Sequence, residues 1–436
     1  MTVNDTSNRF SVEYRDYYKV LTNHITNEKY ALVYCNKTLA DTAGYHAVVN
    51  VPVQRVSVAN ALDILPFMEL LGLQDKVTFI QDPKQVTSPC YNVTDTIASH
   101  IDVVFTNKSN TDSGTSPAYV SFSASDDSLS PLEKASWLVY VAFFFNQEGR
   151  AFVYFNDIMN NYLCHKNNLA NAPSQTYVAW TKYDAPTKTW KLLRDPYYQQ
   201  LMADAGVAKL LQPNSAQSAD FTNLFEFHVQ MQHAESVIDL TPMEYLGDKE
   251  PYLQWLTLGG FNNDTDNYME PFKEKKRVFR MDGLTNANGY PDWPERSPVR
   301  PDLALLDMIH LFYPDYNKDY QFTWVRNFAM LSDPRQINPS TYLACANPLA
   351  ALNQANCVIN DQFKPPNSPT QLSEGDKAGV SVGTIVFFFL VLGAGIFLFR
   401  RYRRRTRHRF YQMDNNAESW TEMDVSKASQ RTPHAI

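Results

Sequence analysis

The chain has 436 residues, a formal net charge of −7 and 44% hydrophobic residues, with 26 Phe and 25 Tyr among them. The part after residue 399 carries nine Lys and Arg against four Asp and Glu, which leaves about −12 on the remainder and argues against nucleic acid as a partner. The length and the apolar content are enough for two packed lobes of ordinary domain size.

The first part of the chain predicts an N-terminal α/β lobe, residues 28–130, after a polar extension, residues 1–27. The extension is expected to be loosely ordered over residues 1–25. Short apolar runs predict strands, and an amphipathic run that stops at Gly72 predicts a helix. The strands are expected at residues 30–34, 52–58, 76–80 and 101–105, and the helix at residues 60–73. Strands and helices that alternate at this spacing are typical of a parallel sheet, and the polar residues 106–130 are expected to form a loop.

A long helical region, residues 131–168, is predicted between this lobe and a C-terminal α/β lobe, residues 169–335. Pro131 and Glu133 are typical of a helix start, and residues 137–145 are apolar on every face, which indicates a helix packed on both sides. In the second lobe, strands are expected at residues 177–180, 236–240 and 277–281, and helices at residues 196–205, 224–232 and 301–312.

Residues 378–399 contain no charged side chain over 22 positions, and about 20 apolar helical residues suffice to cross a bilayer. Seven arginines follow between positions 400 and 409, and positive charge beside a membrane helix stays in the cytoplasm. We therefore expect a stalk at residues 336–377, one transmembrane helix at residues 378–399 and a cytoplasmic basic tail at residues 400–436. The protein would be a single-pass type I protein of the plasma membrane or an endosomal membrane. A buried core helix is the alternative, but core helices seldom end in seven arginines.

The N-terminus raises a question for this topology. Residues 1–9 are polar and have no apolar stretch, so they are not a signal peptide. A folded N-terminal domain needs such a peptide to cross a membrane, and we therefore expect a truncated start or a mature form. The alternative is a tail-anchored protein that faces the cytosol, which would place the arginines on the wrong side of the membrane.

Five cysteines lie before the membrane segment, on the side expected to be oxidising: Cys35, Cys90, Cys164, Cys345 and Cys357. The odd number leaves at least one cysteine without a partner in this chain. Proximity in sequence favours Cys345 with Cys357, and Cys35 with Cys90, as disulfide hypotheses.

Five N-glycosylation sequons also lie before the membrane segment, and none lies after it. They begin at Asn4, Asn36, Asn92, Asn107 and Asn263. We expect a glycoprotein with glycans at Asn36, Asn92 and Asn263.

Catalytic signatures are absent from the sequence. There is no GxSxG, HExxH, P-loop or GxGxxG motif, and the histidines are scattered, which favours surface or structural roles over a metal cluster. We expect no enzymatic activity, no catalytic residues, no metal site and no resident cofactor.

Several motifs in order resemble the solute-binding proteins of bacterial periplasm that capture iron–siderophore complexes, haem or cobalamin, a type III periplasmic-binding-protein-like family. Residues 54–80 (QRVSVANALDILPFMELLGLQDKVTFI) resemble the first lobe of that family, and residues 132–162 resemble its interlobe helix and the helix after it. Second-lobe patterns match at residues 203–206 (ADAG), 234–239 (AESVID), 277–282 (RVFRMD), 292–295 (DWPE) and 301–313 (PDLALLDMIHLFY). The resemblance covers about residues 28–320. The stalk and membrane helix depart from bacterial members and suit a tethered form on a eukaryotic cell surface.

The resemblance implies an α/β fold with two Rossmann-like lobes joined by a long interlobe helix, which capture a metal chelate between them. Open α/β sheets bind ligands at the carboxyl ends of their strands, and a bulky chelate needs aromatic faces and a few fixed donors. Candidate ligand-binding residues in the first lobe are Tyr45, Ser57, Asn60, Asn107 and Lys108, and in the second lobe Trp180, Lys182, Tyr183, Trp293 and Arg296.

Each candidate also has a purely structural explanation. Ser57 and Asn60 can cap the following helix, Trp180 can belong to the core, and Lys108 can be a solvated loop charge. A glycan on Asn107 would crowd the mouth of the cleft. Trp293 and Arg296 are the strongest pair, because a Pro-flanked loop holds them where an aromatic side chain is hard to bury.

The leading hypothesis is a single-pass surface receptor that captures an iron–siderophore complex or a similar chelate (haem or cobalamin) for uptake, with an endocytic or transport partner on its tail. The alternative is an adhesion or interaction ectodomain that keeps the fold without a ligand, which a closed cleft would favour. A third hypothesis, an enzyme with a cysteine-bridged metallocluster on this fold, is opposed by the scattered cysteines.

Overall fold

The computed structural model of the chain describes residues 2–4, 9–34, 37–91, 100–107, 117–173, 177–206, 209–210, 219–261, 270–340, 342–360 and 362–363. These residues belong to one compact unit, residues 1–364. None of the helices in this part is long and apolar enough to cross a membrane, and the predicted membrane segment, residues 378–399, lies outside the described residues. The predicted basic tail lies outside them as well.

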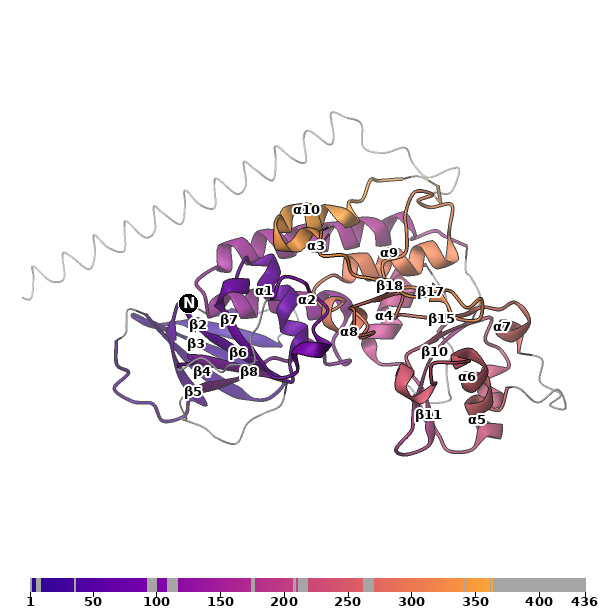
Figure 1. Cartoon of the computed structure of the whole chain (residues 1–436). Coiled ribbons are helices and arrows are strands. Elements are labelled where there is room, and N and C mark those ends of the chain that lie inside the picture. The colour runs from indigo at the N-terminus through magenta and orange to yellow at the C-terminus, as the bar shows by residue number, and fades with distance from the viewer. Residues whose placement is uncertain are drawn as a thin grey trace, which may run out of the picture. The chain divides into compact units, whose positions relative to one another are not determined.

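Two sheets form the first lobe (Figure 1). One has the order β1-β2-β3-β4-β5 and is antiparallel except for the parallel pair β4–β5, and the other has the order β7-β6-β8-β9 and is wholly parallel. The strands are β1 (Thr2–Asn4), β2 (Phe10–Tyr14), β3 (Tyr18–Asn23), β4 (Glu28–Tyr34), β5 (Ala47–Val51), β6 (Val56–Ala59), β7 (Val77–Ile80), β8 (Val103–Thr106) and β9 (Ala118–Ser121). The parallel sheet predicted from the alternation of strands and helices is confirmed.

Residues 1–25, expected to be loosely ordered, instead contribute strands β1, β2 and β3. Along β2, Phe10 and Val12 are buried in the core while their neighbours face outward, so half of the strand is polar and the segment looks like a loop in sequence. The side chain of Asn23 is buried and donates to the Ser121 carbonyl (3.3 Å). Strand β9 likewise lies inside residues 106–130, where we expected a loop.

The helix expected at residues 60–73 is present as a 3-10 turn, η1 (Leu62–Ile64), and α1 (Leu65–Leu70). It ends before Gly72, whose φ of +69° lies in the left-handed region that glycine adopts without strain. Two further 3-10 turns, η2 (Gln74–Lys76) and η3 (Pro83–Gln85), flank β7.

Two helices, α2 (Pro131–Phe143) and α3 (Glu148–Asn168), form the region predicted to be helical. Ser130 and Glu133 make a capping box at the start of α2, and almost all of α2 is buried, as expected for a helix packed on both sides. Asn146, with a φ of +55°, separates α2 from α3. The first half of α3 packs into the core of the first lobe, and its second half packs into the core of the second lobe (Figure 1). Helix α3 is therefore the helix that joins the lobes.

The second lobe is built around a sheet of order β13-β11-β10-β14-β15-β17, in which β10, β14 and β15 are parallel and β12 also pairs with β10. Val178 and Trp180 of β10 enter one core cluster, and Ala179 enters another, so the strand is buried on both faces. The strands are β10 (Tyr177–Asp184), β11 (Thr189–Leu192), β12 (Lys209–Leu210), β13 (Ala219–Phe221), β14 (Ser236–Asp239), β15 (Val278–Arg280), β16 (Leu284–Thr285), β17 (Arg326–Asn327) and β18 (Arg335–Gln336).

Helices cover both faces of this sheet, so the predicted α/β character of the second lobe is confirmed. The helices are α4 (Pro196–Asp204), α5 (Leu224–Met231), η4 (Met243–Tyr245), α6 (Pro251–Gly259), α7 (Pro271–Glu274), α8 (Trp293–Arg296) and α9 (Pro301–Phe312). Strands β16 and β18 form a small separate parallel pair.

Residues 342–360 lie within the region predicted to be a stalk, but they pack on the lobes. They contain η5 (Leu343–Cys345), α10 (Pro348–Leu352) and η6 (Asn353–Ala355). Leu352 is buried in the core of the first lobe, and Ala355 in the core of the second.

Both disulfide hypotheses, Cys345 with Cys357 and Cys35 with Cys90, are wrong. Cys345 pairs with Cys90, and Cys357 pairs with Cys164. The two cysteines of the segment do not pair with each other because each lies against a different part of the fold. Cys35 lies outside the described residues.

Candidate functional site

The first-lobe candidates do not converge. Tyr45 is half-buried and packs edge-to-face on Tyr18, with ring centroids 6.4 Å apart. Ser57 is buried in β6, while Asn60 is exposed with a φ of +59° and makes no side-chain cap, since the residue at the cap position of η1 is Ala61. Asn107 is exposed. Lys108 and the expected glycan sites Asn36, Asn92 and Asn263 lie outside the described residues.

The second-lobe tryptophans belong to the core. Trp180 is 0% exposed and Trp293 is 6% exposed, and their rings stack with centroids 6.3 Å apart. The expectation that Trp293 is hard to bury was wrong, because Trp324 packs edge-on against it at 5.2 Å and completes an aromatic cluster. Tyr183 is half-buried against Trp190, and Lys182 is exposed.

Direct hydrogen bonds join the lobes at the carboxyl ends of their strands. The segment after β7 supplies Thr87, whose backbone N–H donates to Glu295 Oε2 (2.8 Å) and whose hydroxyl donates to Asp292 Oδ1 (2.9 Å). The Asn286 amide donates to the carbonyls of Lys84 and Val86, each at 2.9 Å. Thr87 is 4% exposed, so the cleft is closed by protein at this point.

A buried group of charged side chains lies beside this contact. Arg296 donates through Nε to Asp292 Oδ2 (2.7 Å), which also accepts from Trp324 Nε1 (2.7 Å). The Arg296 guanidinium lies 5.4 Å from the ring centroids of both Trp324 and Tyr342. Of the predicted ligand-binding residues, Arg296 is the one whose environment suits a binding role, because it borders a cavity.

Burial changes the protonation of two carboxyls in this group. It raises the pKa of Glu295 to about 8 and that of Glu69 to about 7, with the nearby Asp292 charge adding to both shifts. Tyr342 donates to Glu69 Oε2 (3.0 Å), whereas Glu69 Oε1 is buried without a hydrogen-bond partner. Both lobes therefore contribute an acid that holds its proton more tightly than usual.

The cavity bordered by Arg296 has a volume of about 590 Å³, within the range of small-molecule sites. Its walls come from α1 of the first lobe, from α8, α9, the segment before β17 and residues 335–338 in the second lobe, and from residues 342–354. The polar and aromatic side chains on the wall include Glu69, Arg296, Arg300, Asp319, Tyr320, Phe322, Arg335 and Tyr342.

The three arginines of the wall differ in their partners. Arg300 is held by both carboxylate oxygens of Asp302 (2.9 Å each), and Arg296 is held by Asp292. Arg335 is exposed, and the hydrogen bonds found for it run to the backbone carbonyls of Phe322 and Thr323. Arg335 can therefore offer its charge to a ligand without giving up an ion pair.

Sequence reasoning missed Glu69, Arg335 and Tyr342. Glu69 lies on a helix that reads as ordinary amphipathic sequence, and the other two lie in or beside the expected stalk. Nothing in their local patterns distinguishes them, because the cavity forms where three distant segments meet. Among the described residues, no group of three or more His, Cys, Asp or Glu side chains is placed to hold a metal ion.

No family model and no curated protein matches the chain. Solved structures that are similar to it include bacterial periplasmic solute-binding proteins. The Ceue protein of Helicobacter pylori with Ni(II) bound is 12% identical, with a TM-score of 0.40, over 63% of this chain and 88% of that one. A periplasmic heme binding protein from Pseudomonas aeruginosa is 14% identical, with a TM-score of 0.43, over 66% of this chain and 100% of that one. A possible iron-binding periplasmic solute-binding protein from Staphylococcus epidermidis is 12% identical, with a TM-score of 0.43, over 60% and 99%.

Each of these identities is below 25% and each TM-score is below 0.5. The fold class is therefore assigned from the order and direction of the chain's own strands. The chain is a mixed α/β protein with a parallel sheet in its first lobe and a largely parallel sheet centre in its second, joined by α3.

Proposed function

We propose that the chain is a solute-binding receptor, and that its ligand is a small metal chelate held in the cavity beside Arg296. The observation that carries the proposal is the cavity itself: about 590 Å³, walled by both lobes, with aromatic faces and a cation that has no acidic partner among the described contacts. A ferric siderophore is the favoured ligand, with haem or cobalamin as the other chelates of suitable size. Binding rather than catalysis is proposed, since the wall offers hydrogen-bond donors and aromatic faces of the kind that hold a small molecule.

The chemistry of the wall suits a chelate with outward-facing oxygens. Arg335 and Arg296 can donate to carboxylate or hydroxamate oxygens, and the rings of Tyr320, Phe322 and Tyr342 offer apolar faces to its organic part. The metal would arrive with the ligand and would need no protein side chain to coordinate it.

We further propose that residues 378–399 tether this unit to a eukaryotic cell surface or endosomal membrane, with the lobes outside and the arginine-rich tail inside. The support is the uncharged 22-residue stretch and the seven arginines that follow it. Residues 364–377 would then form a shorter stalk than expected, because Phe363 still packs against Tyr313 of the second lobe. Uptake would depend on an endocytic or transport partner of the tail. The two disulfides agree with an oxidising compartment.

The test is a titration of the purified full chain with ferric siderophores, haem and cobalamin, followed by tryptophan fluorescence. Arg335→Gln is expected to weaken binding roughly 10- to 100-fold, because a hydrogen bond to a charged group contributes about 1.5 to 3 kcal/mol. Arg55→Gln is the matched control, since Arg55 is exposed and does not line the cavity. No binding of any chelate at micromolar concentration would refute the proposal.

One observation favours the alternative of a ligand-free interaction ectodomain. The hydrogen bonds of Thr87 and Asn286 close the cleft at the strand ends, where such folds bind ligands. Binding of a chelate that is insensitive to Arg335→Gln would leave the receptor function in place but move the site elsewhere. Binding of a protein partner with no chelate binding would support the alternative.

A further inference from the structure

Residues 342–360, called the strap here, form a second connection between the lobes in addition to α3. The strap inserts Leu352 into the core of the first lobe and Ala355 into the core of the second. Helix α10 within it packs on both α1 and α3. Leu352 and Ala355 are three positions apart, so one short stretch of the strap takes part in two hydrophobic cores at once.

Polar contacts bind the middle of the strap to the second lobe. Arg300 donates to the carbonyls of Ala351 (2.6 Å) and Leu352 (3.4 Å) while Asp302 neutralises its charge. Arg300 is 3% exposed, so these are buried, charge-assisted hydrogen bonds.

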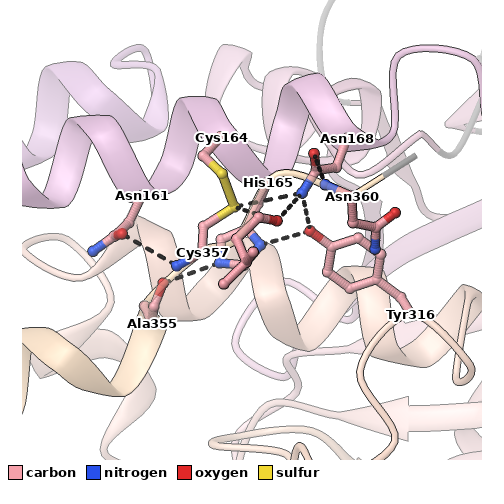
Figure 2. Close-up of a disulfide and its surroundings, with 9 residues drawn as sticks. Asn161, Cys164, His165, Asn168, Tyr316, Ala355, Cys357 and Asn360 are labelled. Atoms are coloured by element: carbon pink, nitrogen blue, oxygen red, sulfur yellow. Dashed lines mark hydrogen bonds between the residues drawn. A yellow bond between two sulfur atoms is a disulfide. The ribbon is translucent and has the colours of Figure 1, made fainter. Parts of the chain in front are cut away.

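The far end of the strap is fastened to α3, as Figure 2 shows. Cys357 forms the disulfide with Cys164, and a ring nitrogen of His165 lies 3.0 Å from the Ala355 carbonyl oxygen. Asn168 donates to the Val358 carbonyl (2.9 Å) and accepts from the Asn360 N–H (3.0 Å). One side chain therefore satisfies a backbone acceptor and a backbone donor of the strap. The attachment lies on the half of α3 that packs in the second lobe.

The near end of the strap is fastened to the first lobe. Cys345 forms the disulfide with Cys90, a residue of the same segment that carries Thr87 into the lobe contact. Tyr342 adds its hydrogen bond to Glu69 on α1. The two disulfides thus attach one short segment to the first lobe at one end and to the second-lobe half of α3 at the other.

We infer that the strap locks the two lobes together, so that the contact at Thr87 stays closed and the lobes do not open as a hinge. Only 11 residues lie between Cys345 and Cys357. Most of them are folded into α10 and η6 and engaged in both cores, so the strap has no spare length to follow an opening motion. Rotation of one lobe about α3 would have to break the cores, the Arg300 bonds or a disulfide. This inference does not depend on what the cavity binds.

The test is hydrogen exchange of the full chain, with the Thr87 amide as the probe because it donates to Glu295 across the lobes. In Cys164→Ser/Cys357→Ser, exchange at Thr87 is expected to become at least tenfold faster, while the amides of β4 inside the first lobe keep their protection. Cys35→Ser is the matched control, since it removes a cysteine that is in neither bridge. Folded full chain treated afterwards with a phosphine reductant gives a second measurement that does not require the variant to fold.

Two results would overturn the inference. Unchanged exchange at Thr87 after loss of the disulfides would mean that α3 and the lobe contact suffice to keep the lobes together. Equal loss of protection at Thr87 and in β4 would mean that the disulfides hold the whole fold and have no particular effect on the lobe contact. Ligand titration is not part of this test, so failure of the proposed receptor function would leave it unaffected.

Discussion

Replacement of Glu295 by Gln is expected to make the protein more stable at alkaline pH and to leave it unchanged at acidic pH. Burial raises the pKa of Glu295 from its ordinary 4.5 to about 8, so the folded state holds the proton more tightly than the unfolded state. The free energy of unfolding is therefore highest below about pH 4.5 and falls as the pH rises to about 8. Gln cannot ionise, and it retains an oxygen for the Thr87 N–H.

The size of the effect follows from the pKa. A difference of about 3.5 pH units sets a ceiling of about 5 kcal/mol at 1.36 kcal/mol per unit. The Gln amide places an N–H where Glu295 Oε1 now has no partner, so part of the gain is lost and about 2 kcal/mol is expected at pH 8.5. For a unit of this size, 2 kcal/mol corresponds to a rise in melting temperature of about 3 °C.

The assay is thermal unfolding of parent and variant at pH 5.0, 7.0 and 8.5, followed by tryptophan fluorescence. Glu274→Gln serves as the control, because Glu274 is exposed on the same lobe. If Glu295→Gln lost stability between pH 5 and pH 8.5 as steeply as the parent, Glu295 would not be the group that carries the proton at the lobe contact.

Two further predictions concern the second lobe. Trp293→Ala should lower the free energy of unfolding by about 3 to 5 kcal/mol, because it leaves a cavity between Trp180 and Trp324. Urea unfolding measures this loss. A loss below 1 kcal/mol would contradict the burial of Trp293 in the core. Arg280→Ala should lower the free energy of unfolding by about 3 to 5 kcal/mol, since it leaves the buried Asp239 (2.8 Å) without a cation, whereas Asp282 keeps its ion pair with Arg326. A variant as stable as the parent at pH 7 would refute this.

The contact between the lobes contains two carboxylic acids with raised pKa values, Glu69 and Glu295. Glu69 and Glu295 come from different lobes and lie near Asp292, so full ionisation would gather three negative charges around one arginine, Arg296. At pH 7 the raised pKa values keep Glu295 largely protonated and Glu69 about half protonated, which reduces that repulsion. Ionisation of these acids weakens the contact between the lobes as the pH rises. The free energy of unfolding expected for the parent with Glu295 falls in the same direction.

Local sequence determined most of the secondary structure. Residues 301–312 form the predicted helix α9, since Pro301 sets its first turn and apolar side chains recur at helical spacing along it. The apolar runs at β4, β7, β10 and β14 were likewise found, because strands buried on both faces carry the signal in consecutive residues. Strand β2 was missed, since a strand with one outward face alternates apolar and polar residues over too short a length to stand out. Strand β3 was missed for a different reason: it is buried on both faces, but it includes Lys19 and Asn23, which are polar residues that sequence patterns place at the surface.

Tertiary structure decided the role of each side chain. Trp180, Trp293 and Arg296 were all placed at a ligand site from sequence, but the two indoles stack in the core, and only the guanidinium borders the cavity. Trp293 is buried because Trp324, more than 25 positions further along the chain, packs against it. The sequence around Trp293 does not indicate that contact.

For the cysteines and the strap as well, the sequence indicated one arrangement and the tertiary structure decided another. All five cysteines precede the predicted membrane segment, and nearness in sequence favoured Cys345 with Cys357. The pairs are instead 255 and 193 residues apart, because the strap returns across both lobes and brings each cysteine to a partner from a distant element. The polar composition of residues 338–360 is that of a stalk, and only the cores into which Leu352 and Ala355 fit make this segment part of the folded unit.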